Sequence, residues 1–287
     1  MPELSPPTRK RYHATLKLVT TMSDHRYDSF VAIGDSFTEG MSDTHPAGGY
    51  RGWADLLATR LAETRPRLRY ANLAIRGKVV GQIAEDQVPS AASMRADLVS
   101  FAGGVNDLMR PRCDLDVVCA AVEGAVGRLV ETSGTLILFQ PIDPSRRMRG
   151  SARLVRRLRH LTALVCELGE RHRAVVVDLA SARVFDDPRL WADDRIHLNG
   201  EGHRRVAEAV GQAIGLPARF DWKAPLPPMR PATLAERRLA DARWARGHLL
   251  PWIGRRLTGR SSGDGLTPKR PSLAPLDVDI SGSGDSR

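Results

Sequence analysis

Short apolar runs alternate with longer amphipathic segments along the first three quarters of the chain. The runs have the length of buried strands, and the segments place apolar residues three or four positions apart, as a helix does. We expect strands at 29–34, 69–73, 96–101, 135–139 and 174–179, and helices at 50–63, 79–87, 114–131, 151–170 and 200–214. This alternation predicts an α/β fold with a doubly wound, mostly parallel five-stranded sheet and helices on both faces.

Composition divides the chain into five parts. Residues 1–26 are polar and aperiodic, and we expect a disordered N-terminal extension there. The folded domain is expected at 27–216, and five prolines predict a Pro-rich linker at 217–232. We expect a basic amphipathic helix at 233–257 and, because the last stretch is rich in Gly, Ser, Pro and Asp, a disordered tail at 258–287.

The formal net charge of +10 is concentrated towards the C-terminus. Residues 22–216 hold 26 basic and 25 acidic side chains, whereas residues 217–270 hold 12 basic and 4 acidic ones. The domain is therefore electrically balanced, and the C-terminal extension is the part suited to an anionic surface.

Two observations bear on the compartment. The chain has three cysteines, an odd number without a C-x-x-C pair, so we expect reduced thiols rather than disulfides or a zinc site. No signal peptide or membrane-spanning segment is visible, and a cytoplasmic location is expected. Met22 is an alternative to Met1 as the start of translation.

Candidate catalytic residues follow the predicted strands, at the edge where open α/β sheets bind ligands. Ser36 comes two residues after the first strand, Gly77 follows the second, and Asn106 follows the third. Asp194 and His197 precede the last helix of the domain. A histidine takes a proton from a serine hydroxyl near neutral pH, and a carboxylate orients its other ring nitrogen. These residue types indicate nucleophilic catalysis by a serine.

The blocks that carry these residues resemble those of the SGNH/GDSL hydrolase family (GDSL-like lipase/acylhydrolase). They read Gly34-Asp35-Ser36 with Gly40, then Gly77, then Gly104-Val105-Asn106-Asp107, then Asp194-Arg195-Ile196-His197. The resemblance departs at Phe37 and Leu198, where the family usually has Leu and Pro. It implies the SGNH-hydrolase, flavodoxin-like fold and ester hydrolysis with no cofactor and no metal.

The resemblance also implies a role for each residue. Ser36 is the expected nucleophile, His197 the base that moves its proton, and Asp194 the acid that orients His197. The backbone N–H groups of Ser36 and Gly77 and the side-chain amide of Asn106 are expected to form the oxyanion hole.

Two alternatives concern the same residues. Asp193 competes with Asp194 as the orienting acid, and the family spacing favours Asp194. A metal site built from His197, His203 and the nearby aspartates is the weaker interpretation, because its ligand spacing is loose.

We expect a serine esterase or acylhydrolase that cleaves carboxylic esters through an acyl-serine intermediate, in the carboxylesterase, lipase or O-acetylesterase class. Its expected partner is a small ester substrate, with a preference for short acyl chains because no long apolar lid is visible. The alternative is a binding or interaction protein in which the hydrolase domain is a scaffold. The complete set of motif residues favours the enzyme. The natural substrate and the oligomeric state stay open.

In that alternative, the basic helix at 233–257 binds an anionic membrane or nucleic acid, and nucleic acid is the less favoured partner. The same helix is expected, slightly more strongly, to pack back on the domain. Neither arrangement places an extension residue among the catalytic residues. A chain ending near Pro217 is therefore expected to keep the active-site chemistry.

Overall fold

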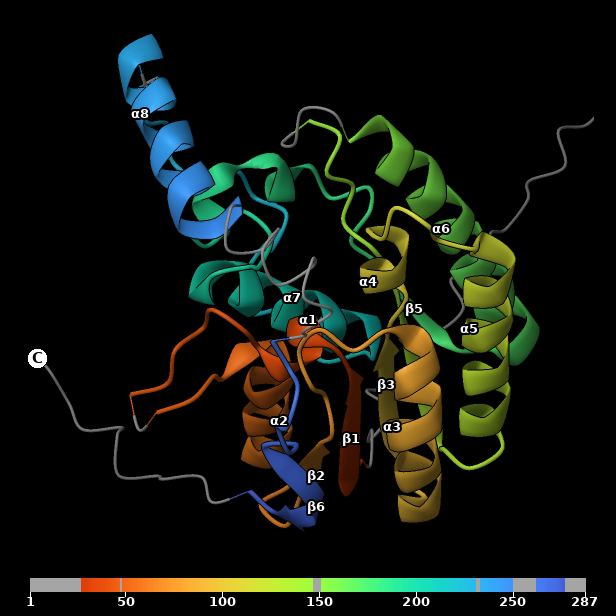
Figure 1. The fold of residues 1–287 in the computed structure, drawn as a ribbon. Coiled ribbons are helices and arrows are strands. Elements are labelled where there is room, and N and C mark those ends of the chain that lie inside the picture. The colour runs from red at the N-terminus through yellow and green to blue at the C-terminus, as the bar shows by residue number, and fades with distance from the viewer. Residues whose placement is uncertain (1–26, 47, 147–150, 231–232, 250–261, 277–287) are drawn as a thin grey trace, which may run out of the picture.

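Six strands pair side by side in one sheet, in the order β5-β4-β3-β1-β2-β6 (Figure 1). The computed structural model describes residues 27–46, 48–146, 151–230, 233–249 and 262–276. Five strands run parallel, and the edge strand β6 pairs antiparallel with β2. The strands are β1 (Ser29–Gly34), β2 (Arg69–Asn72), β3 (Leu98–Ala102), β4 (Thr135–Gln140), β5 (Val175–Asp178) and β6 (Arg270–Pro275).

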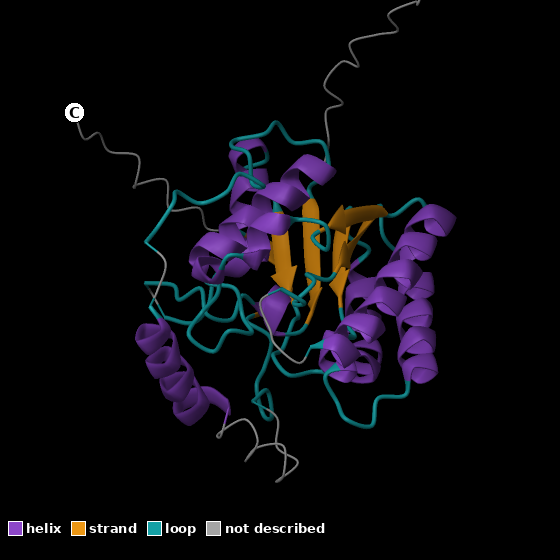
Figure 2. Cartoon of the chain, turned by 90° about the horizontal axis from the view of Figure 1, so that it is seen from above, coloured by secondary structure: helices purple, strands orange, loops and turns teal. Residues whose placement is uncertain are grey.

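Helices cover both faces of this sheet (Figure 2). On one face lie α2 (Gly52–Thr64) and α7 (Gly200–Ala213), whose apolar side chains share a core with Phe30 and Phe139. On the other face lie α3 (Val80–Met94), α5 (Leu115–Val130) and α6 (Ala152–His172), which pack on Val31 and Leu138. Alternate residues of one strand thus face different cores, as the pleat of a strand requires. The predicted α/β fold is confirmed.

The sixth strand corrects the sequence prediction. We expected five strands and a disordered tail at 258–287, but Arg270–Pro275 forms β6. Its backbone pairs with β2, and its side chains are exposed or half-buried, so the segment lacks the apolar run that marks a buried strand. A strand at the edge of a sheet tolerates the two prolines, because one side of it needs no ladder hydrogen bonds.

The predicted linker also belongs in part to the domain. Trp222 is 8% exposed and lies in the same core as α2 and α7, and Phe220 and Leu226 pack against this core. The Arg205 guanidinium donates hydrogen bonds to the carbonyl oxygens of Trp222 and Ala224. The boundary at 216 is therefore placed too early, because a few apolar side chains anchor this proline-containing stretch.

The basic helix begins as α8 (Leu234–Trp244) and continues as one π-helical turn, Ala245–Leu249. None of the eleven side chains of α8 is buried, and Leu234 and Leu239 are 72% and 53% exposed. The predictions for residues 1–26 and 250–257 lie outside the described residues. Within the described residues, no helix is both long and apolar enough to cross a membrane.

Candidate active site

Ser36 follows β1 directly and begins the short helix α1 (Ser36–Glu39). Gly34 ends β1 with a φ of 153°, and a Cβ there would lie 2.5 Å from the carbonyl oxygen of Ala102 on β3. Asp35 caps α1, because its carboxylate accepts a 3.1 Å hydrogen bond from the backbone N–H of Phe37. Local structure thus explains the two residue types before Ser36: the glycine permits the close approach of β3, and the aspartate caps the helix.

His197 connects Ser36 with Asp194 through its two ring nitrogens. Its Nε2 atom lies 2.9 Å from Ser36 Oγ, and its Nδ1 atom lies 2.6 Å from Asp194 Oδ2. The other carboxylate oxygen of Asp194 accepts hydrogen bonds from the backbone N–H groups of Ile196 and His197, which fixes its orientation. The structure thus joins Ser36 and His197, 161 residues apart, in one chain of hydrogen bonds.

The charge of Asp194 selects the tautomer of this histidine. Burial by itself would raise the pKa of Asp194, but the hydrogen bond and the charge of His197 outweigh it and lower the pKa from 3.8 to about 2. An ionised carboxylate only accepts hydrogen bonds, so Nδ1 carries the hydrogen and Nε2 accepts from the Ser36 hydroxyl. This is the tautomer that a base for Ser36 needs.

Asn106 lies on α4 (Val105–Leu108) and connects two of the loops. Its Nδ2 atom donates to Asp35 Oδ2 at 3.1 Å and to the carbonyl oxygen of Lys78 at 2.9 Å. Gly77, which precedes Lys78, has a φ of 76°, in the left-handed region that favours glycine. The side chain of Asn106 thus ties the turn that carries Ser36 to the turn that carries Gly77.

The geometry does not support the two alternatives from the sequence, Asp193 as the orienting acid and a metal site. Asp194, and not Asp193, faces the ring of His197. The buried ring of His203 accepts from the Trp53 N–H and donates to the Met41 carbonyl, and burial lowers its pKa to about 4. Within the described residues, no group of three or more His, Cys, Asp or Glu side chains is placed to hold a metal ion.

Two glycines allow the end of α1 to cross the start of α2 at very short range. A Cβ on Gly52 would lie 2.2 Å from Gly40 Cα, and a Cβ on Gly40 would lie 2.5 Å from the carbonyl oxygen of Arg51. The crossing explains why Gly40, the fourth residue after Ser36, is a glycine: any side chain there would push the two helices apart.

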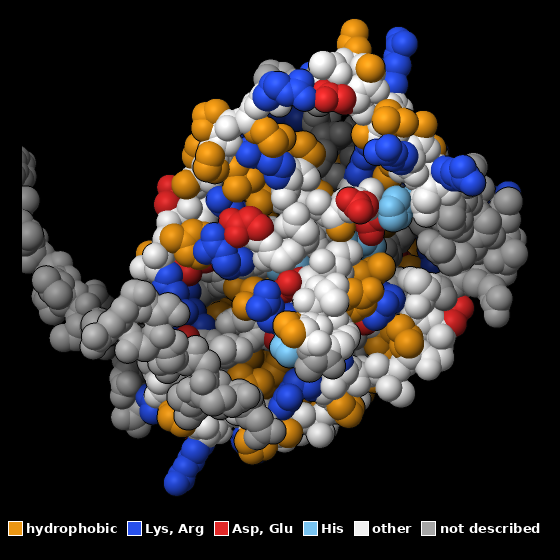
Figure 3. All heavy atoms as spheres, turned by 90° about the vertical axis from the view of Figure 1, so that its left-hand side faces the viewer, with side chains coloured by type: hydrophobic (Ala, Val, Ile, Leu, Met, Phe, Trp, Pro, Cys, Tyr) orange, Lys and Arg blue, Asp and Glu red, His pale blue; other side chains and the backbone are white. Residues whose placement is uncertain are grey.

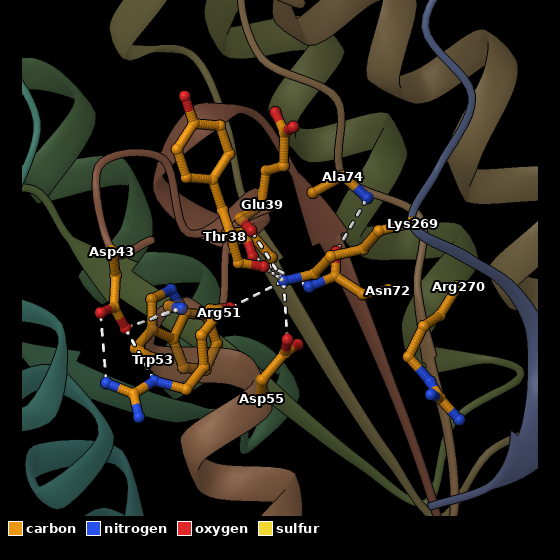
Figure 4. Close-up of polar contacts among 12 residues, drawn as sticks. Thr38, Glu39, Asp43, Arg51, Trp53, Asp55, Asn72, Ala74, Lys269 and Arg270 are labelled. Atoms are coloured by element: carbon orange, nitrogen blue, oxygen red, sulfur yellow. Dashed lines mark hydrogen bonds and ion pairs between the residues drawn. The ribbon is translucent and has the colours of Figure 1, made fainter. Parts of the chain in front are cut away.

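Lys269, in the C-terminal segment just before β6, binds the backbone at this crossing (Figure 4). Its Nζ atom donates to the carbonyl oxygens of Glu39 at 2.7 Å, Tyr50 at 3.1 Å and Arg51 at 2.7 Å, and lies 3.0 Å from Asp55 Oδ2. Burial lowers the pKa of Lys269, and the Asp55 carboxylate opposes this effect. One ammonium group thus binds three backbone carbonyls at the crossing, and the nearby carboxylate balances its charge.

The side chain of Glu39 holds the loop before Gly77. It accepts hydrogen bonds from the backbone N–H of Arg76 at 2.7 Å and from Arg76 Nε at 3.0 Å. Gly263 packs on the same loop, since a Cβ there would lie 2.0 Å from the carbonyl oxygen of Arg76. The C-terminal segment therefore contacts both the end of α1 and the Gly77 loop.

The end of α8 contacts the loop that carries Asp194. The indole N–H of Trp244 donates a 2.9 Å hydrogen bond to the carbonyl oxygen of Asp194. Arg195 lies over the Trp244 ring and pairs with Asp241 at 2.6 Å. The helix thus meets the loop of Asp194 and Arg195 with one end instead of lying along a helix of the domain.

An apolar cavity of about 180 Å³ lies beside Ser36 and His197. Asp35, Asn106 and His203 also line it, and the rest of the lining is backbone and apolar side chains. The lining residues come from the ends of β3 and β4, from α5 and α6, and from the loops that carry Trp191 and Ile196. The chain of hydrogen bonds therefore lies next to space for an apolar group.

Sequence reasoning missed Lys269, Glu39 and Trp244. The ligands of Lys269 are backbone carbonyls, which every residue has, so no motif reveals them. Glu39 lies inside the first sequence block, and Arg76 directly precedes Gly77. Their opposite charges are a weak signal for the ion pair that they form between the two loops. Trp244 lies in the helix that we expected to pack back on the domain, and nothing in the sequence indicates its contact with Asp194.

Fold and site together define an SGNH-type ester hydrolase. The family model described as GDSL-like lipase/acylhydrolase matches residues 32–205, and the chain belongs to this family. The matched stretch includes the positions of all five predicted site residues. A comparison with curated proteins gave no match.

Solved structures show the same fold. LAE5, described as an alpha/beta hydrolase enzyme from the metagenome of Lake Arreo, Spain, is 27% identical with a TM-score of 0.56, over 65% of this chain and 94% of its own. A catalytic mutant of Axe2, an acetylxylan esterase from Geobacillus stearothermophilus, is 23% identical with a TM-score of 0.56, over 68% of this chain and 95% of its own. Another Axe2 mutant is 21% identical with a TM-score of 0.55, over 67% and 97% of the two chains.

Proposed function

We propose that the protein hydrolyses carboxylic esters through an acyl-enzyme formed on Ser36. The observation that carries this proposal is the hydrogen-bonded chain from Asp194 through His197 to Ser36 beside an apolar cavity. His197 Nε2 takes the hydroxyl proton as Ser36 Oγ attacks the ester carbonyl, and Asp194 stabilises the imidazolium that results. The ring then gives the proton to the departing alcohol. In the second half, His197 activates water, which releases the acid and restores Ser36.

The negative oxygen of the tetrahedral intermediate needs hydrogen-bond donors. We assign this role to the backbone N–H groups of Ser36 and Gly77 and to Nδ2 of Asn106. The bond from Asn106 to the Lys78 carbonyl supports the assignment, because it orients the amide. In this assignment the second amide hydrogen, which points to Asp35 before substrate binds, turns to the oxyanion.

A serine-reactive fluorophosphonate probe and a panel of small soluble esters test the proposal. The native chain is expected to be labelled once and to hydrolyse esters. Ser36→Ala is expected to remain folded, to escape labelling and to lose several orders of magnitude in turnover. Ser90→Ala, an exposed serine of α3, is the matched control and is expected to behave as the native chain does. More than a tenth of native turnover in purified Ser36→Ala would overturn the proposal.

A second candidate function is binding to an anionic membrane through α8. The exposure of Leu234 and Leu239 beside the arginines of this helix favours it. On the face shown in Figure 3, however, Lys and Arg side chains alternate with acidic ones and do not form one basic patch. Sedimentation with anionic vesicles tests this function: binding at low salt that weakens at high salt supports it, and no sedimentation at low salt contradicts it.

A further inference from the structure

We propose that the apolar cavity beside Ser36 binds the acyl chain of the ester and selects chains of about four to eight carbons. The inference rests on the proposed function, because it assigns one half of the substrate to a site. It replaces the preference for short acyl chains that the missing lid suggested.

The cavity is long because α6 lines it over several turns. Five residues of α6 border the space at spacings of three or four: Leu154, Leu158, Leu161, Val165 and Leu168. Residues at these spacings lie above one another on one helix face, and at 1.5 Å per residue Val165 lies about 10 Å along the axis from Leu158. Since α6 follows the carboxyl end of β4, Leu154 is near the catalytic edge and Leu168 is far from it.

The wall of the cavity opposite α6 is equally apolar. Phe101 and Leu138 border it from β3 and β4, and Val122 and Val126 border it from α5. These side chains and those of α6 carry no hydrogen-bonding group, so a sugar or peptide group placed among them would leave its polar atoms without partners. A methylene chain gives up no hydrogen bonds on entering. Four of the polar lining residues, Asp35, Ser36, Asn106 and His197, lie at the site, where the ester group itself must bind. The fifth, His203, uses both ring nitrogens in hydrogen bonds to the backbone of Trp53 and Met41.

The volume sets the length of the chain. An apolar cavity of roughly 150 Å³ holds a benzene molecule, which has six carbons. The cavity of about 180 Å³ therefore has room for on the order of six carbons. An acetyl group would leave most of this space empty, and atoms that line an empty space lose their contacts. Each methylene that fills it is expected to raise kcat/KM roughly fourfold.

Hydrolysis of p-nitrophenyl esters from acetyl to dodecanoyl tests the inference. The native chain is expected to gain in kcat/KM from acetyl to about hexanoyl and to lose again beyond octanoyl. Val165→Phe fills the deep part of the cavity, and Leu158→Phe fills it nearer to Ser36. We expect Val165→Phe to lower the hexanoyl-to-acetyl ratio of kcat/KM about tenfold and Leu158→Phe to lower it further. Because two depths are probed, the test survives if one variant does not fold.

The matched control is Val117→Phe, the same substitution at an α5 position that is 64% exposed and does not border the cavity. Its ratio of hexanoyl to acetyl turnover is expected to equal that of the native chain. The inference is overturned if acetyl is the best substrate and each added methylene lowers kcat/KM, or if Val165→Phe and Leu158→Phe keep the native ratio. In both cases the proposed ester hydrolysis stands. If no ester of any length is hydrolysed, the proposed function falls and the inference falls with it.

Discussion

Lys269 Nζ donates a 2.7 Å hydrogen bond to the carbonyl oxygen of Glu39, the last residue of the helix that begins at Ser36. The two residues are 230 positions apart, and Lys269 lies well beyond residue 205, where the family match ends. The bond joins the C-terminal segment to the turn that presents the candidate nucleophile. This segment is therefore part of the hydrolase domain in a physical sense.

Lys269→Met is expected to lower the free energy of unfolding by about 2–4 kcal/mol. The substitution removes the donor for three backbone carbonyls and leaves Asp55 without its ion-pair partner. Urea unfolding measures the loss. We also expect kcat to fall more than KM changes, because a displaced α1 misplaces Ser36 in the transition state.

Arg238→Met is the control for this variant, since Arg238 is an exposed cation of α8 in the same extension. It is expected to stay within about 0.5 kcal/mol of the native chain. Equal stability of the two variants would show that the Lys269 contacts contribute nothing.

A chain that ends at Pro217 is now expected to lose both stability and ester hydrolysis, in contrast to the expectation from the sequence. It would lack the buried Trp222 and the two carbonyls that bind Arg205, whose side chain is 7% exposed. Arg205 would keep its ion pair with Glu201 but would lose both carbonyl acceptors, and a buried donor left without an acceptor is destabilising. A chain that ends at Leu276 keeps these contacts and Lys269, and is expected to match the full chain. Thermal unfolding and ester turnover are measured for the two truncated chains. A native melting temperature and native turnover in the chain that ends at Pro217 would contradict this prediction.

Asn106→Ala is expected to lower kcat by roughly 10²–10³, the usual effect of removing one oxyanion donor. KM is expected to change little, because the amide bond to the oxyanion strengthens only in the transition state. Steady-state kinetics on one soluble ester separates the two constants. A tenfold rise in KM at native kcat would instead make Asn106 a contact for the bound substrate.

Asp35 is expected to make stability depend on pH. Burial raises its pKa from 3.8 to about 6, although the Phe37 N–H and the charge of His197 act against it. The folded chain therefore holds a proton that the unfolded chain has released, and the stability this contributes is complete below pH 3.8 and lost as pH rises through 6. The two pKa values correspond to roughly 3 kcal/mol.

Asp35→Asn removes this titration and keeps an oxygen to cap α1. The free energy of unfolding of the native chain, minus that of the variant, should decrease between pH 4 and 6 and level off above pH 7. Urea unfolding at four pH values measures it, and a difference independent of pH would contradict the assignment.

Local patterns determined most of the domain from the sequence alone. All five predicted strands are present within two residues at either end, because a buried parallel strand needs an apolar run and little else. The turn at Asp194 and His197 is equally local, since the carboxylate and the ring are three residues apart. Ser36, Gly77 and Asn106 were predicted because parallel strands end at one edge, and the four blocks appear in the family's order.

Tertiary structure decided everything that depends on backbone groups or on shape. Lys269 binds the carbonyl oxygens of Glu39, Tyr50 and Arg51, which the close crossing of Gly40 and Gly52 brings together. Strand β6 is held by backbone pairing at an open sheet edge, where side chains need no apolar pattern. The cavity beside Ser36 is the space left between side chains of several elements, and each fits the ordinary pattern of a helix or strand core. Periodicity shows which side chains are buried, whereas only their joint packing shows where space remains.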